Sequence, residues 1–327
     1  MRFLVVGAGS IGSVVGGFLH LAGHQVYLVG KGPHIETVAE RGLDIGGIWG
    51  EHRIDTMSAA TTVKAALDDG FKPEWTLLSV KSYDTRGALD DLKPALPGQR
   101  GVVSLQNGLG NVEAISEAAP GMAVGGRVIF GATTIQPGTV DVTVSADDVL
   151  LGPAPGGPDG VEEVCEAFRE SGIPCRFEQK ILSFIWDKVL YNVCLNALAT
   201  LLKTDYGSLG NDPGTWSIME KLASEFYEVA SVEKVELVSP DAGQYLDRFR
   251  EELLPPTSGH RSSMQEDIEQ GRQTEIDALN GAVARLGRKH GIETPVNDAL
   301  TGIIRFLEYQ SRKNATKGPG PDVSFLR

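Results

Sequence analysis

The sequence contains 327 residues, of which 41% are hydrophobic and 22% charged, and its formal net charge is −13. A chain of this length exceeds what one hydrophobic core usually organises, so we expect two domains. The negative charge repels phosphate backbones and no block of Lys or Arg offsets it, which argues against nucleic acid as a partner. No apolar run reaches the roughly 18 residues of a membrane helix. No signal peptide is visible either, and we expect a cytoplasmic protein with no membrane partner.

The cysteines and histidines give no sign of a metal centre. Cys165, Cys175 and Cys194 are odd in number and lack the spacing of zinc or redox motifs, so we expect reduced thiols. The six histidines are scattered, without an H-E-x-x-H pair or a His/Cys cluster. We therefore predict no metal site.

A glycine-rich turn at the N-terminus is the first candidate site. The apolar run at residues 3–6 predicts a strand, and a helix-like segment follows a turn made of Gly7, Ala8, Gly9, Ser10, Ile11 and Gly12. In a dinucleotide-binding turn, such glycines allow the sharp bend, the approach of the pyrophosphate and close helix packing. A chance turn is the alternative in a chain with 40 glycines. The second predicted strand, residues 25–29, follows at βαβ distance and favours dinucleotide binding.

The end of the second strand indicates which dinucleotide binds. An NAD enzyme usually places Asp or Glu there to bind the ribose 2′-hydroxyl, but this chain has Lys31, with His34 close behind. Cations at this point suit a 2′-phosphate, so we predict NADP(H) as the cofactor. The alternative is that Lys31 is a solvated loop residue.

Further strands alternate with helical segments and predict a doubly wound sheet of Rossmann type. Strands are expected at residues 76–80 and 102–105, in a β-rich section from 124 to 151, and at IPCRF, residues 173–177, which we take as the last strand. Ligands bind beyond the carboxyl ends of such strands, where Lys81 and Asn107 stand. Each also has an ordinary explanation, as a solvated lysine and as part of an Asn-Gly turn.

After the last strand the pattern becomes helical, so we predict domains at residues 1–178 and 179–327. The first long helix contains WDKVLYNVCLNAL, residues 186–198, and is apolar nearly all round. Lys188, Asn192 and Asn196 recur every four residues and therefore share one face. A narrow solvated stripe is one explanation. Asparagines are poor helix formers, however, and a partly buried lysine suits proton donation, so we favour a substrate-binding face.

A second polar segment in the helical half is HRSSMQEDIEQGRQTEIDALNG. Ser263 and Glu275 would lie about 18 Å apart on one unbroken helix, so a small ligand could reach both only if the helix breaks. We predict that Gly271 ends one helix and that Thr274, with Asp277, caps the next. Glu275 would then stand in a first turn, where complementing the helix dipole is its ordinary explanation.

Taken together, GAGSIG, SVK, QNG, WDKVLYNVCLNAL and SSMQEDIEQGRQTEIDALNG resemble the ketopantoate reductase (2-dehydropantoate 2-reductase) family, in order and over nearly the whole chain. The resemblance implies a Rossmann domain, an all-α C-terminal domain and an active site in the cleft between them. It also implies reduction of ketopantoate to (R)-pantoate by NADPH, on the route to pantothenate and coenzyme A.

By the same resemblance, Lys188 is the catalytic acid, and Glu275 holds and charge-balances it. The substrate-binding residues are Asn192, Asn196 and Ser263. Lys81 and Asn107 lie where cofactor and substrate meet, and Asn107 contacts either the substrate or the cofactor. Two departures stand out. Relatives often carry Arg at the position of Lys31, and residues 205–256 do not match closely.

Three alternative functions remain. The chain could reduce another small 2-keto acid, or act as a β-hydroxyacid dehydrogenase, although the second asparagine argues against that class. It could also be a sensor that holds NADP(H) without turnover. A monomer and a homodimer are both compatible with the sequence, and the tail at residues 313–327 is expected to be loosely ordered.

Overall fold

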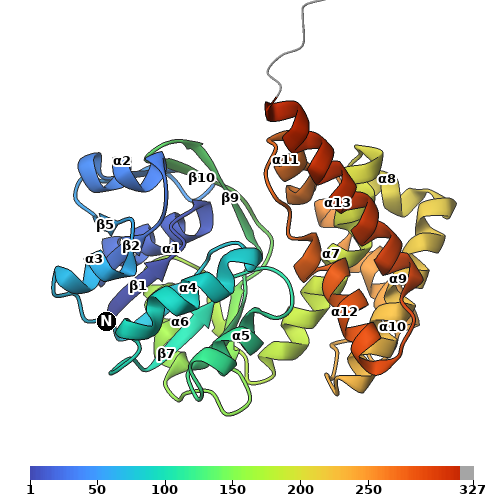
Figure 1. The fold of residues 1–327 in the computed structure, drawn as a ribbon, viewed down its shortest axis with the longest axis horizontal. Coiled ribbons are helices and arrows are strands. Elements are labelled where there is room, and N and C mark those ends of the chain that lie inside the picture. Colours follow the sequence, from blue (N-terminus) through green and yellow to red (C-terminus); the bar gives the residue numbers. More distant parts are fainter. Residues whose placement is uncertain (317–327) are drawn as a thin grey trace, which may run out of the picture. The chain divides into compact units, whose positions relative to one another are not determined.

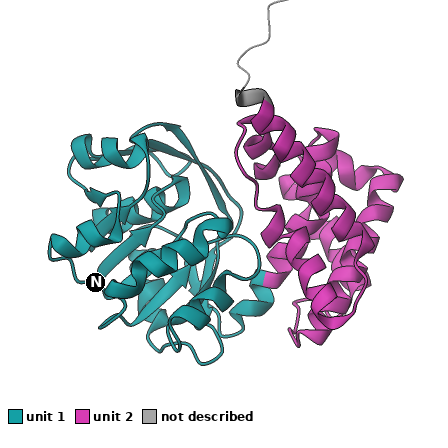
Figure 2. Cartoon of the chain, viewed as in Figure 1, with its two compact units in different colours: residues 1–185 teal, residues 186–327 magenta. Residues whose placement is uncertain are grey.

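The structure is a computed structural model that describes residues 1–316, and it divides into two compact units, residues 1–185 and 186–327 (Figure 1, Figure 2). We predicted a domain boundary between residues 178 and 179. The division between the two units falls seven residues later, within a long helix, and the predicted boundary stays a prediction. Most of the tail expected to be loose falls outside the described residues. Residues 313–316 of that tail are helical, contrary to the expectation.

Unit 1 is built on an eight-stranded sheet with the order β12-β11-β8-β7-β6-β1-β2-β5. Neighbouring strands pair in parallel, except that β8 and β11 are antiparallel. The predicted strands are confirmed, although the third ends two residues early. The strands are β1 (Arg2–Val6), β2 (Gln25–Val29), β5 (Ser58–Ala60), β6 (Trp75–Leu78), β7 (Gly101–Ser104), β8 (Ala123–Arg127), β11 (Val149–Pro153) and β12 (Cys175–Phe177).

Helices cover both faces of this sheet, as predicted for a doubly wound fold (Figure 1). α1 contacts α6, whereas α3, α4 and α5 form a separate group of contacting helices. Right-handed crossovers require this division, because the connections on the two sides of β1 run in opposite directions along the sheet. The helices are α1 (Ser10–Leu21), α2 (Pro33–Arg41), α3 (Val63–Asp68), α4 (Thr85–Leu92), α5 (Asn111–Ala118) and α6 (Val161–Glu170).

A second sheet, with the order β4-β3-β10-β9, encloses α1 from its other side. Its strands are β3 (Leu43–Gly47), β4 (His52–Ile54), β9 (Phe130–Gln136) and β10 (Thr139–Ser145). Adjacent glycines allow α1 to fit between two sheets. A β-carbon on Gly16 would lie 2.5 Å from Cδ2 of Leu28 in the main sheet, and one on Gly17 would lie 2.5 Å from Cδ1 of Ile45 in the second. Neither this sheet with β3 and β4, nor β5 at the edge of the main sheet, was predicted from the sequence.

Unit 2 is helical, as predicted (Figure 2). Its first helix, α7, begins in the last residues of unit 1, and a short π-helical turn, Phe249–Leu253, follows α10. The helices are α7 (Ile181–Leu202), α8 (Tyr206–Asn211), α9 (Pro213–Val232), α10 (Ala242–Arg248), α11 (Ser263–Glu269), α12 (Asn280–His290) and α13 (Pro295–Thr316).

Helix α7 is the longest apolar segment of the described chain. By length and composition it could cross a membrane, contrary to the expectation that no segment would, but 61% of its apolar window is buried inside the protein. Leu190, Val193 and Leu195 on different sides of it are fully buried. A helix that is apolar all round and covered by protein is the core helix of its unit.

The poorly matched region, residues 205–256, consists of helices that start at aspartates. The carboxylates of Asp205, Asp212 and Asp241 each accept a hydrogen bond from the backbone N–H three residues on, at 2.7–2.9 Å. These bonds also lower the pKa of Asp205 and Asp241. Asp is among the best N-cap residues, which explains why α8, α9 and α10 begin directly after these three positions.

A buried carboxylate joins α9 to the start of α13. Glu225 is 8% exposed and accepts hydrogen bonds from the backbone N–H groups of Val296 and Asn297, at 2.9 and 3.1 Å. It also accepts one from Nδ2 of Asn297 at 2.7 Å, and Oδ1 of Asn297 accepts from Asn280 on α12. The carboxylate thus satisfies the free N–H groups and the positive dipole end of α13.

Replacement of Glu225 by Ala should destabilise unit 2. The change leaves three buried donors without an acceptor, at a cost of roughly 3 kcal/mol in the free energy of unfolding. We expect the melting temperature, followed by circular dichroism, to fall by several degrees. Glu228→Ala, an exposed position on the same helix, is the matched control and should leave it nearly unchanged. Equal melting temperatures for the two variants would contradict this role.

Candidate functional site

Four polar or glycine-rich segments of unit 1 lie at the same edge of the main sheet. They follow β1, β2, β6 and β7, which are neighbours in the order β7-β6-β1-β2. The last residues of these strands are in register, because Val6 pairs with both Val29 and Leu78, and Leu78 pairs with Ser104. The glycine turn, Lys31, Lys81 and Asn107 are therefore grouped at the carboxyl ends of these strands. β2 and β5 were added on one side of β1, and β6 and β7 on the other, so the strand order changes direction here, which is the point where doubly wound sheets bind ligands.

Gly7 and Gly12 are required by close backbone contacts. Gly7 has a φ of 103°, and a β-carbon there would lie 2.3 Å from the backbone nitrogen of Val80. A β-carbon on Gly12 would lie 2.5 Å from the carbonyl oxygen of Gly7 and 2.6 Å from Oγ of Ser79. Ser79 in turn donates a hydrogen bond of 2.9 Å to that carbonyl oxygen. The fold itself thus explains two of the three motif glycines.

Gly9 is different, because the folded chain leaves room for a side chain there. Its φ is −82°, and the nearest atom to an added β-carbon is 4.0 Å away. Gly9 is exposed and is the N-cap of α1, where no side chain caps the helix. The first N–H groups of α1 are thus available to an anion, and only a group outside the chain gives a reason for glycine at this position. The turn fits a dinucleotide pyrophosphate.

A buried polar network fixes the two loops that carry Lys81 and Asn107. Nε2 of Gln106 donates to the carbonyl of Val80 at 2.8 Å and to Oγ1 of Thr85 at 2.7 Å. Thr85 donates to Oδ1 of Asn111 at 2.8 Å, and Nδ2 of Asn111 donates to the carbonyl of Asn107 at 2.8 Å. Sequence analysis missed these residues, although Gln106 belongs to the QNG motif. The signal available was a run of amide and hydroxyl side chains beside two strand ends.

The loop after β2 carries an exposed Lys31, whereas His34 is engaged inside the unit. Nε2 of His34 lies 2.9 Å from Oγ of Ser13, and the backbone N–H of Gly138 donates to Nδ1 at 3.1 Å. Burial lowers the pKa of His34, so the ring is neutral at pH 7. The expectation that His34 adds positive charge for a phosphate is therefore wrong, and Lys31 carries the charge in this loop.

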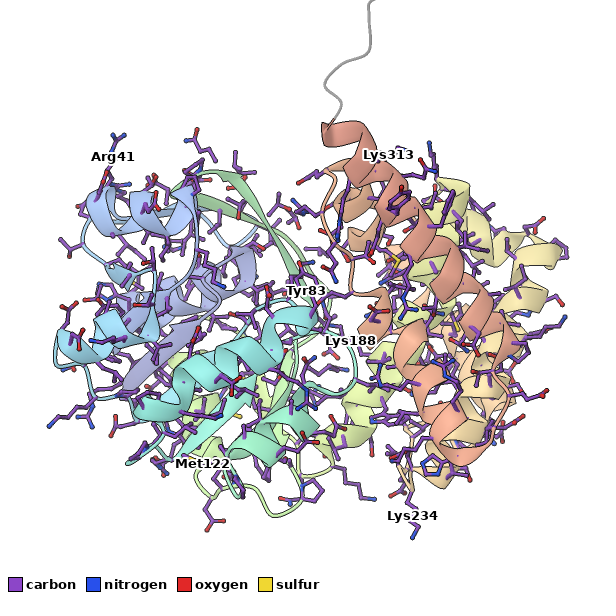
Figure 3. The ribbon with its side chains drawn as sticks, in the orientation of Figure 1. Arg41, Tyr83, Met122, Lys188, Lys234 and Lys313 are labelled. Atoms are coloured by element: carbon purple, nitrogen blue, oxygen red, sulfur yellow. The ribbon has the colours of Figure 1, made fainter. Side chains whose placement is uncertain are left out.

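In unit 2 the three polar residues of α7 lie on one continuous helix, as predicted (Figure 3 labels Lys188). Lys188 and Asn192 are half-buried, and Asn196 is 4% exposed. The hydroxyl of Tyr206 donates to Oδ1 of Asn196 at 2.6 Å and orients its amide. Burial raises the pKa of Tyr206, so this hydroxyl stays a donor at neutral pH. Sequence analysis missed Tyr206 because it stands on α8, in the segment that matched poorly.

The second polar segment breaks as predicted, but its cap differs. α11 ends at Glu269, and Gly271 has a φ of 67°, which glycine adopts readily. Oγ1 of Thr274 accepts from the N–H of Ile276 at 3.2 Å, but this starts only a short 3₁₀ turn. Asp277, the expected partner of that cap, instead forms an ion pair of 2.6 Å with Arg305, so the predicted acidic cap is wrong.

The candidate substrate residues in this segment differ in exposure. Ser263 is exposed at the first position of α11, whereas its neighbour Ser262 is fully buried and caps that helix through the N–H of Met264, at 3.1 Å. Glu275 is half-buried and follows the cap residue Thr274. Ser263, rather than Ser262, is therefore the serine that a ligand could reach.

The described residues do not form a cluster of potential metal ligands. Within residues 1–316, no group of three or more His, Cys, Asp or Glu side chains is arranged to hold a metal ion. Cys165, Cys175 and Cys194 are free and buried, which confirms the expectation of reduced thiols.

Residues 3–156 match the family described as "Ketopantoate reductase PanE/ApbA", and residues 180–308 match its C-terminal domain, "Ketopantoate reductase PanE/ApbA C terminal". The chain belongs to the ketopantoate reductase family. Members of this family are oxidoreductases that reduce 2-keto acids with a nicotinamide cofactor. The C-terminal match includes residues 205–256, so the region that resembled the family least in sequence also belongs to it.

Ketopantoate reductases with curated names and solved structures resemble the chain over most of its length. The 2-dehydropantoate 2-reductase of Aquifex aeolicus (strain VF5) is 37% identical over 318 residues, covering 96% of this chain and 99% of the relative. The crystal structure of a PanE/ApbA family ketopantoate reductase from Ralstonia eutropha JMP134 has a TM-score of 0.84 at 27% identity, covering 95% of this chain and 100% of the other. D-mandelate dehydrogenase, solved with NADH and anilino(oxo)acetate, has the same TM-score and identity, with coverages of 95% and 99%.

The contrast between the glycines of the N-terminal turn gives a prediction. Gly9→Ala should leave the melting temperature within about 2 °C, because the added methyl meets nothing in the folded chain. It should weaken NADPH binding at least tenfold, a loss of about 1.4 kcal/mol, because the methyl occupies the approach of the pyrophosphate. Fluorescence titration of the reduced cofactor measures this directly.

The matched control is Gly87→Ala on α4, where an added β-carbon also meets nothing within 4 Å. That variant should bind NADPH like the wild type. If Gly9→Ala also keeps wild-type affinity, the turn does not hold the pyrophosphate.

Proposed function

We propose that this chain reduces 2-dehydropantoate (ketopantoate) to (R)-pantoate with NADPH, a step of pantothenate and coenzyme A biosynthesis. The observation that carries the proposal is the 37% identity with the Aquifex aeolicus 2-dehydropantoate 2-reductase, over 96% of this chain and 99% of the relative. It is supported by the polar residues of unit 2, which include a lysine and two asparagines on one face of its core helix.

In this proposal Lys188 is the general acid. Its half-buried ammonium polarises the C2 carbonyl and donates a proton to the oxygen as negative charge develops there. When bound, the nicotinamide supplies the hydride that reduces the carbonyl carbon. Glu275 balances the charge of the lysine and favours its protonated form. The proposal thus assigns the hydride to the cofactor and the proton to Lys188.

The other residues bind and orient. Asn192 and Asn196 contact the hydroxyl end of the substrate, and Ser263 contacts its carboxylate. Asn107 contacts the substrate or the nicotinamide ribose, and Lys81 orients the cofactor. Amide and hydroxyl groups contribute position more than charge, which matches a reaction whose charge change is carried by the lysine.

The preference for NADPH rests on Lys31. The exposed ammonium follows β2, where a ribose 2′-phosphate would lie, and no carboxylate occupies residues 30–34. A lysine contributes charge without the two-pronged contact of arginine, so the preference should be moderate.

A second candidate function is the reduction of a different 2-keto acid. D-mandelate dehydrogenase shares the fold at a TM-score of 0.84, and its structure contains NADH and the keto-acid analogue anilino(oxo)acetate. The fold therefore accommodates NADH and a keto-acid analogue that carries an aromatic ring.

A substrate panel tests the proposal. We expect NADPH oxidation, followed at 340 nm, to be fastest with 2-dehydropantoate and at least about a hundredfold slower in kcat/KM with pyruvate, 2-ketoisovalerate and phenylglyoxylate. A site built to bind a substrate hydroxyl discriminates strongly against analogues that lack it. NADH in place of NADPH should lower kcat/KM. Selective turnover of phenylglyoxylate with NADH would favour the second candidate instead.

Removing the proposed acid should impair chemistry without impairing cofactor binding. We expect Lys188→Ala to lower kcat by roughly 10²–10⁴-fold, the usual contribution of a general acid, with an unchanged Kd for NADPH. Lys221→Ala, an exposed lysine on α9, is the matched control. A wild-type kcat in Lys188→Ala would show that another group donates the proton.

A further inference from the structure

His34 connects three separate segments of unit 1 through its two ring nitrogens. Nε2 lies 2.9 Å from Oγ of Ser13 on α1, and Oγ of Ser13 lies 3.4 Å from the carbonyl oxygen of Ala8 in the glycine turn. On the other side, Nδ1 accepts from the backbone N–H of Gly138, at 3.1 Å, in the turn between β9 and β10. The imidazole thus spans the glycine turn and a hairpin more than a hundred residues away in sequence.

These contacts fix the direction of every hydrogen bond. Because the N–H of Gly138 donates to Nδ1, the ring proton must be on Nε2, which donates to Ser13. The hydroxyl of Ser13 is then left to donate to the carbonyl of Ala8. Ser13 is fully buried, so water cannot replace its partners. The neutral ring agrees with the lowered pKa of His34, which burial causes against the opposing effect of the Gln136 carbonyl.

The turn between β9 and β10 packs closely against α2. Gly138 has a φ of 81°, and a β-carbon there would lie 2.8 Å from Cγ2 of Thr37, one turn after His34 on the same helix. Its carbonyl accepts from the N–H of Asp44 at 2.9 Å, which ties the turn to β3. The second sheet therefore provides a rigid support against which His34 holds the start of α2.

We propose that His34 is a positioning residue that fixes the loop carrying Lys31 relative to the glycine turn, and so enables the protein to select a cofactor with a 2′-phosphate. Only Gly32 and Pro33 separate Lys31 from His34, so contacts that hold His34 act within three residues of Lys31. Through Ser13, His34 is connected to the glycine turn, which is proposed to bind the pyrophosphate. Through its place in the chain, it is connected to the loop of Lys31, which is proposed to bind the 2′-phosphate. This inference rests on the proposed preference for NADPH.

A double-mutant cycle tests the inference, with Kd values for NADPH and NADH measured by fluorescence titration in the absence of any keto acid. His34→Phe keeps the ring volume and removes both hydrogen bonds, and Lys31→Ala removes the charge. We expect His34→Phe to raise the Kd for NADPH about tenfold and that for NADH about threefold. In the Lys31→Ala background, His34→Phe should raise the Kd for NADPH only about threefold, because the loop then has no phosphate contact to position.

Conservative variants separate the two hydrogen bonds. His34→Asn can still accept from Gly138, and His34→Gln can still donate to Ser13, so each should recover part of the NADPH affinity. Ser13→Ala removes only the Ser13 contact, so its Kd for NADPH should resemble that of His34→Asn. His20→Phe, a histidine in the last turn of α1, is the matched control and should bind both cofactors like the wild type. If His34→Phe does not fold, the Asn, Gln and Ser13 variants give the same comparison.

Two results would overturn the inference: equal effects of the His34 variants on NADPH and NADH, or additivity with Lys31→Ala. A wild-type protein that binds NADPH no better than NADH would overturn it as well. Failure to reduce 2-dehydropantoate would reject the proposed function, but it would leave the binding cycle intact, because the cycle contains no keto acid.

Discussion

Backbone contact between Gly7 and the Ser79–Val80 segment aligns the candidate cofactor groups of unit 1. A β-carbon on Gly7 would overlap the nitrogen of Val80, so the turn after β1 lies directly against the loop after β6. Gln106 then links the carbonyl of Val80 to the loop after β7. One close contact and one buried amide thus bring together the loops that follow three neighbouring strands, β1, β6 and β7.

Two polar side chains of the apolar helix α7, those of Asp187 and Asn196, are bound to neighbouring elements of unit 2. Asp187 forms an ion pair of 2.5 Å with Arg248 of α10, with only 15% of its side chain exposed. The adjacent Lys188 points elsewhere around α7, since successive helical residues are about 100° apart. Asn196 is oriented by Tyr206 of α8. Asp187 and Asn196 therefore cost less than isolated buried groups would, and the directions of their side chains are fixed before any ligand arrives.

Local signals allowed much of the fold to be predicted from the sequence. The first strand, the glycine turn, the second strand and the apolar helix α7 depend on residues close together in the chain. β3 and β4 were missed because β3 pairs with β10, almost a hundred residues later, where Val140 pairs with Ile45, and the three-residue β4 pairs only with β3. Asp277 was interpreted as part of a cap because its partner, Arg305, lies 28 residues later. Side-chain partners at such distances depend on the assembled tertiary structure, which short-range patterns do not encode.

His34 shows the same limit most clearly within the candidate cofactor site. Its place two residues beyond the Lys31–Gly32 pair suggested a second positive charge, yet the N–H of Gly138 makes Nδ1 an acceptor and leaves the ring neutral. Residue type and proximity in the chain gave the right location and the wrong chemical role. A histidine near an anion site can supply a positive charge, or it can be a neutral positioning residue. Its hydrogen-bond partners distinguish the two roles.

The chemistry of α7 bears on which keto acid the proposed enzyme reduces. A ketone beside a carboxylate is common to all 2-keto acids, so a lysine acid does not discriminate among them. Asn196 could distinguish one 2-keto acid from another. Its side-chain oxygen already accepts a hydrogen bond from Tyr206, which leaves its NH₂ group to donate. A donor fixed in a buried position needs an oxygen acceptor and is left unsatisfied against a phenyl ring. If Asn196 binds the substrate as proposed, the orientation imposed by Tyr206 favours a substrate with a hydroxyl at its far end, as 2-dehydropantoate has, over an aromatic keto acid.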